Sequence, residues 1–259
     1  MDNLLNDNII EELRTIYTCL DHTSLSDTDT ERSVVQFCEE TLRMAESTPN
    51  AGHVASVCVY PLYAGAASRV LKGSGIKVAS VAGAFPTGQS PLEIRISEIH
   101  NALDHGADEI DTVIRRGLVL EGNTQQVEDE LYAIREACGT STLKVIIETC
   151  QLPTEQLVRT ATELAIHCGA DFVKTSTGKS TAGATLDASQ IMIETLEKYY
   201  QETGKIVGFK AAGGISTPDQ AYSYFRMCKH LLSKKTFPSQ VFRIGTSRLT
   251  PLLLQYLTA

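Results

Sequence analysis

The 259-residue sequence lacks any apolar run near the roughly 20 residues that a membrane-spanning helix needs. Its first ten residues include two aspartates and no lysine or arginine, so we expect no secretory signal there. Positive charge is scarce: 23 Lys and Arg stand against 31 Asp and Glu, for a net charge of −8. That balance argues against a general nucleic-acid surface, although a few local donors can still bind one phosphate. We therefore expect neither a membrane nor a nucleic acid as a partner.

The cysteines and histidines lack the spacings of redox, disulfide and metal sites. The seven cysteines are odd in number and include no CxxC pair, which favours reduced thiols in a cytoplasmic protein. The six histidines form no HxH or HExxH cluster, so we expect no metal. His22, which follows Asp21, is interpreted as a hydrogen-bonded structural histidine, and Cys58 as core packing.

Short runs rich in Val and Ile alternate with longer amphipathic stretches along the chain. Short apolar runs with turn residues nearby are typical of buried parallel strands. We expect strands at 17–21, 54–60, 76–81, 108–114, 143–149, 171–175, 206–210 and 241–245. Helical spacing of apolar residues is clearest at 30–44, 91–104, 127–138, 153–167, 188–199 and 218–229. One more helix, over residues 3–16, is expected before the first strand.

This alternation predicts an α/β protein built from strand–helix units. The length suits a (β/α)8 TIM barrel, and a doubly wound open sheet is the alternative. No linker rich in Pro or Ser, low-complexity segment or plain internal repeat divides the chain. We therefore expect one domain over residues 1–259: a single barrel with an extra N-terminal helix.

Two lysines stand at the ends of runs that otherwise favour burial. Lys174 lies in DFVKT and Lys210 ends IVGFK. Burying an ammonium is costly unless it is paired or neutral, and the carboxyl ends of barrel strands form the active-site face. A neutral lysine attacks a carbonyl to form an imine, and a second cation or burial lowers its pKa enough to supply that form. Lys174 and Lys210 are the candidate pair, with Asp111 of DEIDTVI as a proton relay. The alternative for either lysine is an ordinary surface cation.

Turns that contain glycine follow the last three predicted strands. TSTGKS, residues 175–180, fails as a P-loop because Val173 occupies the position of the first glycine. AAGG (211–214) and GTS (245–247) each precede a helix, where backbone N–H groups favour an anion. Barrels often bind phosphate after strands seven and eight, and ordinary turn chemistry is the alternative. Glu148, which ends the run LKVIIE, is expected to pair with a lysine or to touch substrate.

Taken in order, these segments resemble the deoxyribose-phosphate aldolase family over nearly the whole chain. The shared motifs are LDHTSL, VCVYP, AFPTG, ADEIDTVI, LKVIIET, GADFVKTSTGK, VGFKAAGGI and FRIGTS. The resemblance implies a barrel with no metal or organic cofactor, which cleaves 2-deoxy-D-ribose 5-phosphate to glyceraldehyde 3-phosphate and acetaldehyde. Its implied partners are therefore a phosphosugar and small aldehydes.

The same resemblance implies a role for individual residues. Lys174 matches the Schiff-base lysine, Lys210 the second lysine that lowers its pKa, and Asp111 the aspartate of the proton relay. By the same match, Lys144 and Lys179 are further polar members of the site. Gly213, Gly214 and Ser247 fall where the family binds phosphate.

Three features depart from the family pattern. Ala211 replaces a usual proline, and Arg248 replaces a frequent second serine. Some members carry a C-terminal tail that ends in an active-site tyrosine, whereas this sequence stops at Ala259; if a tail matters here, Tyr256 is a poor substitute. Arg248 would either strengthen phosphate binding or reshape the pocket. Two other functions stay open, a Schiff-base barrel for another phosphosugar or longer aldehyde and a sugar-phosphate sensor without turnover. The oligomeric state is open as well, with a homodimer as one assembly.

Overall fold

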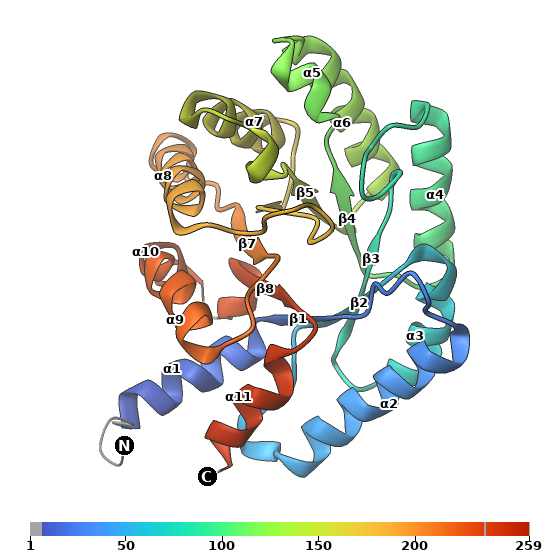
Figure 1. Cartoon of the computed structure of the whole chain (residues 1–259), viewed down its shortest axis with the longest axis vertical. Helices are drawn as coiled ribbons and strands as arrows, with labels where there is room; N and C mark the ends of the chain where they lie inside the picture. Colours follow the sequence, from blue (N-terminus) through green and yellow to red (C-terminus); the bar gives the residue numbers. More distant parts are fainter. Residues whose placement is uncertain (1–6, 236, 259) are drawn as a thin grey trace.

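The computed structural model describes residues 7–235 and 237–258, and its strands close into a parallel barrel in sequence order. Figure 1 shows the strands at the centre and the helices around them. The strands are β1 (Leu20–Thr23), β2 (Ser56–Val59), β3 (Lys77–Val81), β4 (Glu109–Val113), β5 (Thr142–Ile146), β6 (Phe172–Lys174), β7 (Gly208–Ala212) and β8 (Phe242–Thr246). Pairing of β1 with β8 closes the ring, which confirms the (β/α)8 barrel and makes the open-sheet alternative wrong.

Helices follow the strands around the outside of the barrel. They are α1 (Asp7–Thr18), α2 (Glu31–Ser47), α3 (Ala64–Leu71), α4 (Leu92–Asp104), α5 (Arg116–Leu120), α6 (Thr124–Cys138), α7 (Glu155–His167), α8 (Leu186–Thr203), α9 (Pro218–Met227), α10 (Lys229–Leu232) and α11 (Leu249–Leu257). Short 3-10 turns are η1 (Pro49–Ala51), η2 (Pro61–Tyr63), η3 (Thr149–Gln151) and η4 (Pro238–Gln240). Within the described residues, no helix is both long and apolar enough to cross a bilayer.

The extra N-terminal helix is confirmed as α1, and it covers the amino-terminal end of the barrel. It contacts η1 and η4, the turns that lead into β2 and β8, and it packs on α9 and α11 (Figure 1). Glu12 fixes it to the α9–α10 region by accepting from the Tyr222 hydroxyl at 2.6 Å and pairing with Lys229 at 3.1 Å. The helix runs to Thr18, so the strand expected at 17–21 is misplaced and β1 begins only at Leu20. Residues 3–6 of the predicted helix lie outside the described residues.

The other predicted elements are found with shifted ends, because backbone pairing rather than composition sets where a strand stops. The run at 206–210 predicted the seventh strand, but pairing with β8 carries β7 on to Ala212. The short helices α3, α5 and α10 were not among the predicted elements.

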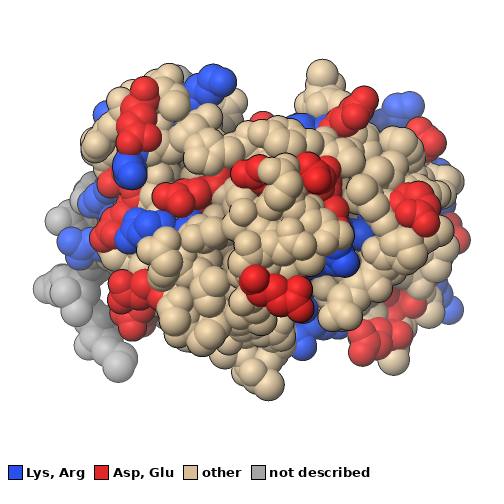
Figure 2. All heavy atoms as spheres, turned by 90° about the horizontal axis from the view of Figure 1, so that it is seen from above, with Lys and Arg blue, Asp and Glu red and all other residues tan. Residues whose placement is uncertain are grey.

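On the face drawn in Figure 2, Lys and Arg side chains are scattered among Asp and Glu.

The barrel has an apolar outside and a largely charged inside. Most buried apolar side chains form one core between the strands and the helices. A small second cluster, Cys58, Ala79 and Val81, packs with partly buried Leu25, Tyr60 and Phe85. Several strands also bury ionisable side chains, which is costly unless each charge finds a partner. The functional site follows from how those partners are arranged.

Candidate active site

Lys174, Lys210 and Asp111 meet inside the barrel, although they come from three different strands. Lys174 ends β6, Lys210 lies in β7 and Asp111 lies in β4. The Oδ2 atom of Asp111 accepts a hydrogen bond from each amine, at 2.7 Å in both cases. Lys174 is 3% exposed and the other two are fully buried, so none of the three is a surface charge.

Lys144 joins the same group from β5. Its amine lies 2.8 Å from Oδ1 of Asp111, so this one carboxylate contacts three lysines. The Lys144 amine is also 2.6 Å from Glu109 and 3.5 Å from Asp21. Lys144 therefore belongs to the buried network, beneath the solvent-accessible pocket.

Three members of this network were not found from the sequence. They are Asp21 of β1, Glu109 of β4 and Arg243 of β8. The Arg243 guanidinium donates to Asp21 at 2.6 Å and to Glu109 at 2.9 and 3.1 Å, and Asp21 also accepts from Lys210. Each is a charged residue next to or inside an apolar run, so the test that selected the lysines would have found them too.

The charges of the network balance without Lys174. It contains three carboxylates and three other cations, namely Asp21, Glu109 and Asp111 with Lys144, Lys210 and Arg243. A protonated Lys174 adds one uncompensated positive charge at a position that is only 3% exposed. Burial lowers the pKa of Lys174, and the charge of Lys210 lowers this pKa further, against the opposing effect of Asp111.

The pKa values of the other cations in the network shift in the opposite direction. Burial alone would lower the pKa of Lys210, but the carboxylates of Asp111 and Asp21 outweigh burial and raise it. Nearby carboxylates likewise raise the pKa values of Lys144 and Arg243 despite burial. Burial would raise the pKa of Asp111, but its three lysine neighbours hold that pKa well below its usual range. Within this network, Lys174 is thus the cation that is driven toward its neutral, nucleophilic form.

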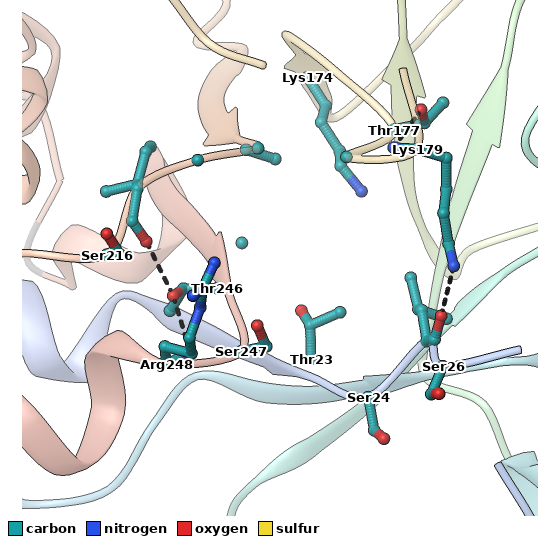
Figure 3. Close-up of a pocket in the computed structure, with 17 residues that line it drawn as sticks. Thr23, Ser24, Ser26, Lys174, Thr177, Lys179, Ser216, Thr246, Ser247 and Arg248 are labelled. Atoms are coloured by element: carbon teal, nitrogen blue, oxygen red, sulfur yellow. Dashed lines mark hydrogen bonds between the residues drawn. The ribbon is translucent and has the colours of Figure 1, made fainter. Parts of the chain in front are cut away.

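A pocket of about 420 Å³ opens above Lys174, between the loops that follow β1, β6, β7 and β8. Figure 3 shows the Lys174 side chain directed into this space, with Lys179 on one side and Ser216, Ser247 and Arg248 on the other. A candidate nucleophile, several hydroxyl groups, glycines and a guanidinium therefore line the same pocket.

Gly213 and Gly214 line the pocket after β7, both with left-handed backbones at φ of 89° and 80°. A side chain at Gly213 would lie only 2.7 Å from the Cα atom of Gly183, in the loop after β6. The N–H of Ala184 donates to the carbonyl of Ala212 at 2.9 Å, which holds the two loops together. Glycine at 213 is therefore required by close backbone approach, and the bare backbone of Gly214 adjoins open space.

Ser247 and Arg248 form the pocket wall after β8, just before α11. The hydroxyl oxygen of Thr246 accepts from the N–H groups of Arg248 and Leu249 at 3.3 and 3.2 Å, which fixes this turn. Among the ion pairs that the described residues form, none includes Arg248. Its guanidinium therefore lies at the pocket without a carboxylate partner.

Lys179 lies on the opposite wall and links two loops. Its amine donates to the carbonyl of Leu25 at 2.6 Å and to Asp27 at 3.0 Å. It therefore ties the loop after β6 to the loop after β1 (Figure 3).

Among the described residues Glu148 pairs with no lysine, so that one of its two expected roles is wrong, while contact with substrate stays a prediction. The chain turns sharply after β5, with Glu148 at φ 54°, and this turn directs the side chain toward the loop after β6. There the carboxylate accepts from the N–H of Thr177 at 3.2 Å and from the Thr177 hydroxyl.

The structural interpretations of His22 and Cys58 are confirmed. The Nδ1 atom of His22 lies 3.1 Å from the Thr41 hydroxyl, and the ring packs 4.2 Å from that of Phe37. Burial lowers the pKa of His22 to about 4. Cys58 is fully buried in the small apolar cluster, and burial raises the pKa of its thiol to about 11. Within residues 7–235 and 237–258, no group of three or more His, Cys, Asp or Glu side chains is arranged to hold a metal.

The buried, neutral state of His22 predicts a specific dependence of stability on pH. Between its ordinary pKa of 6.5 and its folded pKa of about 4, the unfolded chain binds a proton that the native protein does not. Stability therefore falls as the pH drops through this window, by about 3 kcal/mol for this residue. We expect urea unfolding of His22→Gln to lose less stability than the wild type between these pH values. The exposed His100→Gln variant is the control, and equal pH slopes for wild type and His22→Gln would contradict the prediction.

Known proteins share both the sequence and the fold. Residues 15–223 match the DeoC/LacD family of aldolases. The chain is 38% identical to human deoxyribose-phosphate aldolase over 242 residues, which covers 90% of this chain and 76% of the human protein. A solved structure described as QR15, an aldolase, is 26% identical with a TM-score of 0.78, over 94% of this chain and 96% of its own. The deoxyribose phosphate aldolase of Aeropyrum pernix, 24% identical with a TM-score of 0.75 over 98% of each chain, shares the fold. Since the family match spans most of the sequence, the protein belongs to the DeoC/LacD family of aldolases.

Proposed function

We propose that this protein reversibly cleaves 2-deoxy-D-ribose 5-phosphate to D-glyceraldehyde 3-phosphate and acetaldehyde through a Schiff base on Lys174. One observation carries the proposal: Lys174 has a lowered pKa and faces a pocket, while the other cations of its buried network are held protonated. The deoxyribose-phosphate aldolases to which the chain is similar support this choice of substrate.

The first step follows from the lowered pKa of Lys174, which increases the share of the neutral amine. Its Nζ attacks the aldehyde carbon of the open-chain sugar, and loss of water gives a protonated imine. The positive charge of this iminium forms beside Asp111, whose carboxylate lies 2.7 Å from Nζ. Burial and the charge of Lys210, which lower the pKa of the amine, also act on the iminium and make it a stronger electron acceptor.

The iminium then acts as the electron sink for breaking the carbon–carbon bond. As the bond between C2 and C3 breaks, its electron pair moves to form an enamine, and the C3 hydroxyl loses its proton to give glyceraldehyde 3-phosphate. A proton is then added to the enamine carbon, and water hydrolyses the resulting iminium to release acetaldehyde. We assign the proton transfers to Asp111 acting with Lys210 and a water, because Asp111 already accepts from both amines.

The far wall of the pocket suits the phosphate group. Gly213 and Gly214 present bare backbone, Ser247 adds a hydroxyl, and Arg248 adds a guanidinium without a carboxylate partner. The ends of α9 and α11 that begin next to this wall favour a negative charge. Lys179 adds a positive charge on the opposite wall, and we include it among the substrate-binding residues.

A sensor that binds a sugar phosphate without turnover is disfavoured, since recognition alone does not require a buried lysine with a lowered pKa at the pocket. We infer that residues 1–259 act as one aldolase domain in the cytoplasm, where the seven thiols stay reduced. Its proposed partners are the phosphosugar and the aldehydes. A homodimer stays a prediction.

The assignment of Lys174 is tested by incubating the protein with acetaldehyde and sodium borohydride and mapping peptides by mass spectrometry. Borohydride reduces the imine to a secondary amine, so we expect an ethyl group on the peptide that contains Lys174. Lys174→Ala should fold and should lose at least about a thousandfold in kcat, because the covalent route is gone. The exposed Lys205→Ala should retain both adduct and turnover. Turnover by Lys174→Ala, or an adduct only on another lysine, would overturn the assignment.

The role of Arg248 is tested by Arg248→Ser, which restores the serine frequent in the family. Loss of one charge-assisted contact should raise KM for the phosphorylated substrate about tenfold and leave kcat nearly unchanged. Cleavage of 2-deoxyribose without phosphate should be unaffected, so the preference for phosphate should fall by the same factor. Arg226→Ser removes an equal charge from the exposed side of α9 and serves as the control. An unchanged preference for phosphate in Arg248→Ser would show that Arg248 does not bind it.

A further inference from the structure

Glu148 is a buried carboxylate beside the pocket that the proposed reaction does not use. It is fully buried, and none of the ion pairs among the described residues includes it. Arg116 interacts with it electrostatically without forming an ion pair, so hydrogen bonds must replace most of those that the carboxylate had with water. Those bonds come from the N–H and hydroxyl of Thr177, with the thiol of Cys150 at 3.7 Å.

The backbone of Glu148 adds a second cost. With φ 54° and ψ 65° it occupies the left-handed region, which is unfavourable for a residue other than glycine by about 1 kcal/mol. Glycine would suit this turn and would leave no carboxylate to bury. A charged side chain in a strained, buried turn therefore points to a requirement for the carboxylate itself.

The contact of Glu148 determines what Thr177 offers to the pocket. Thr177 lines the pocket near Lys174, and its hydroxyl donates to Oε2 of Glu148. A hydroxyl has one proton to donate and two lone pairs that accept. The N–H of Lys179 occupies one lone pair at 3.1 Å. The proton of Thr177 is therefore committed, and one lone pair remains to accept a hydrogen bond.

We propose that Glu148 is a positioning residue that holds Thr177 as a hydrogen-bond acceptor for a hydroxyl of the phosphosugar. The hydroxyl concerned lies between the aldehyde carbon, which Lys174 attacks, and the phosphate. This inference rests on the proposed function, because it requires a polyhydroxylated substrate in the same pocket. Glu148 acts through Thr177, and we place no substrate contact on Glu148 itself.

A second contact between the loops after β5 and β6 provides a control for the loss of a connection between them. Gln151 also connects the loop after β5 to the loop after β6, since its amide donates to the Ser180 hydroxyl at 3.4 Å. Neither Gln151 nor Ser180 lines the pocket above Lys174. Gln151→Ala therefore removes a tie between the same two loops without changing a group that we place against substrate.

The test is a double-mutant cycle with Glu148→Gln, Thr177→Val and the double variant, alongside Glu148→Ala and Gln151→Ala. We measure KM and kcat for 2-deoxyribose 5-phosphate and Kd for its unreactive alcohol, 2-deoxyribitol 5-phosphate. Thr177→Val should raise KM and Kd about tenfold, Glu148→Ala by a similar factor and Glu148→Gln by less, with kcat within about threefold in each. The double variant should be no worse than Thr177→Val alone, and Gln151→Ala should match the wild type.

The outcomes separate this inference from the proposed function. Borohydride trapping of acetaldehyde on Lys174 should be equal in all variants, which shows that the site is folded. If Glu148→Ala does not fold, the double-mutant cycle with Glu148→Gln tests the positioning role by itself. Unchanged KM and Kd in the Glu148 variants, or losses that multiply in the double variant, would overturn the positioning role. A wild type that neither binds nor cleaves the phosphosugar would instead overturn the proposed function.

Discussion

The carboxylate of Asp111 is the contact on which the rest of the site depends. It accepts from Lys144, Lys174 and Lys210 at 2.7 to 2.8 Å, in a place with no exposure to solvent. Such a concentration of charge is tolerated only when the opposite charges balance, and here they balance when Lys174 is neutral. The stability of the barrel interior and the nucleophilicity of Lys174 are thus two consequences of one electrostatic constraint.

The barrel brings these groups together because each strand contributes one or two inward side chains at a fixed height. The network draws on β1, β4, β5, β6, β7 and β8, and these positions are far apart in the sequence. The loops at the carboxyl ends then add a second layer of contacts, in which Lys179 ties the β6 loop to the β1 loop and Gly213 lets the β6 and β7 loops meet. The pocket therefore lies above a buried network of paired charges, and contacts between neighbouring loops connect its walls.

Much of this was predictable, since Lys174 and Lys210 are conspicuous in apolar strand runs and the alternating pattern predicts a barrel. The partners of those lysines were not, because contacts across a closed barrel depend on strand register and not on sequence distance. Asp21, Glu109 and Arg243 could have been selected as charged residues in or beside apolar runs, but their pairing with one another and with the lysines could not. A lysine partner, one of the two alternatives for Glu148, was wrong because a left-handed turn directs the side chain to Thr177, and the run LKVIIET does not indicate such a turn. The start of β1 was misplaced because Tyr17 and Thr18 complete a helix.

The measurement that tests this account most directly is the pH dependence of imine trapping on Lys174, in the wild type and in Lys210→Met. The wild-type midpoint should lie below the value of about 10.4 that is typical of a free lysine. Removing Lys210 deletes a repelling charge and frees Asp111 to pair with Lys174, so the midpoint should rise by about one pH unit or more. The exposed Lys205→Met should leave it unchanged. An ordinary midpoint in the wild type, or an unchanged midpoint in folded Lys210→Met, would contradict the claim that burial and the charge of Lys210 lower the pKa of Lys174.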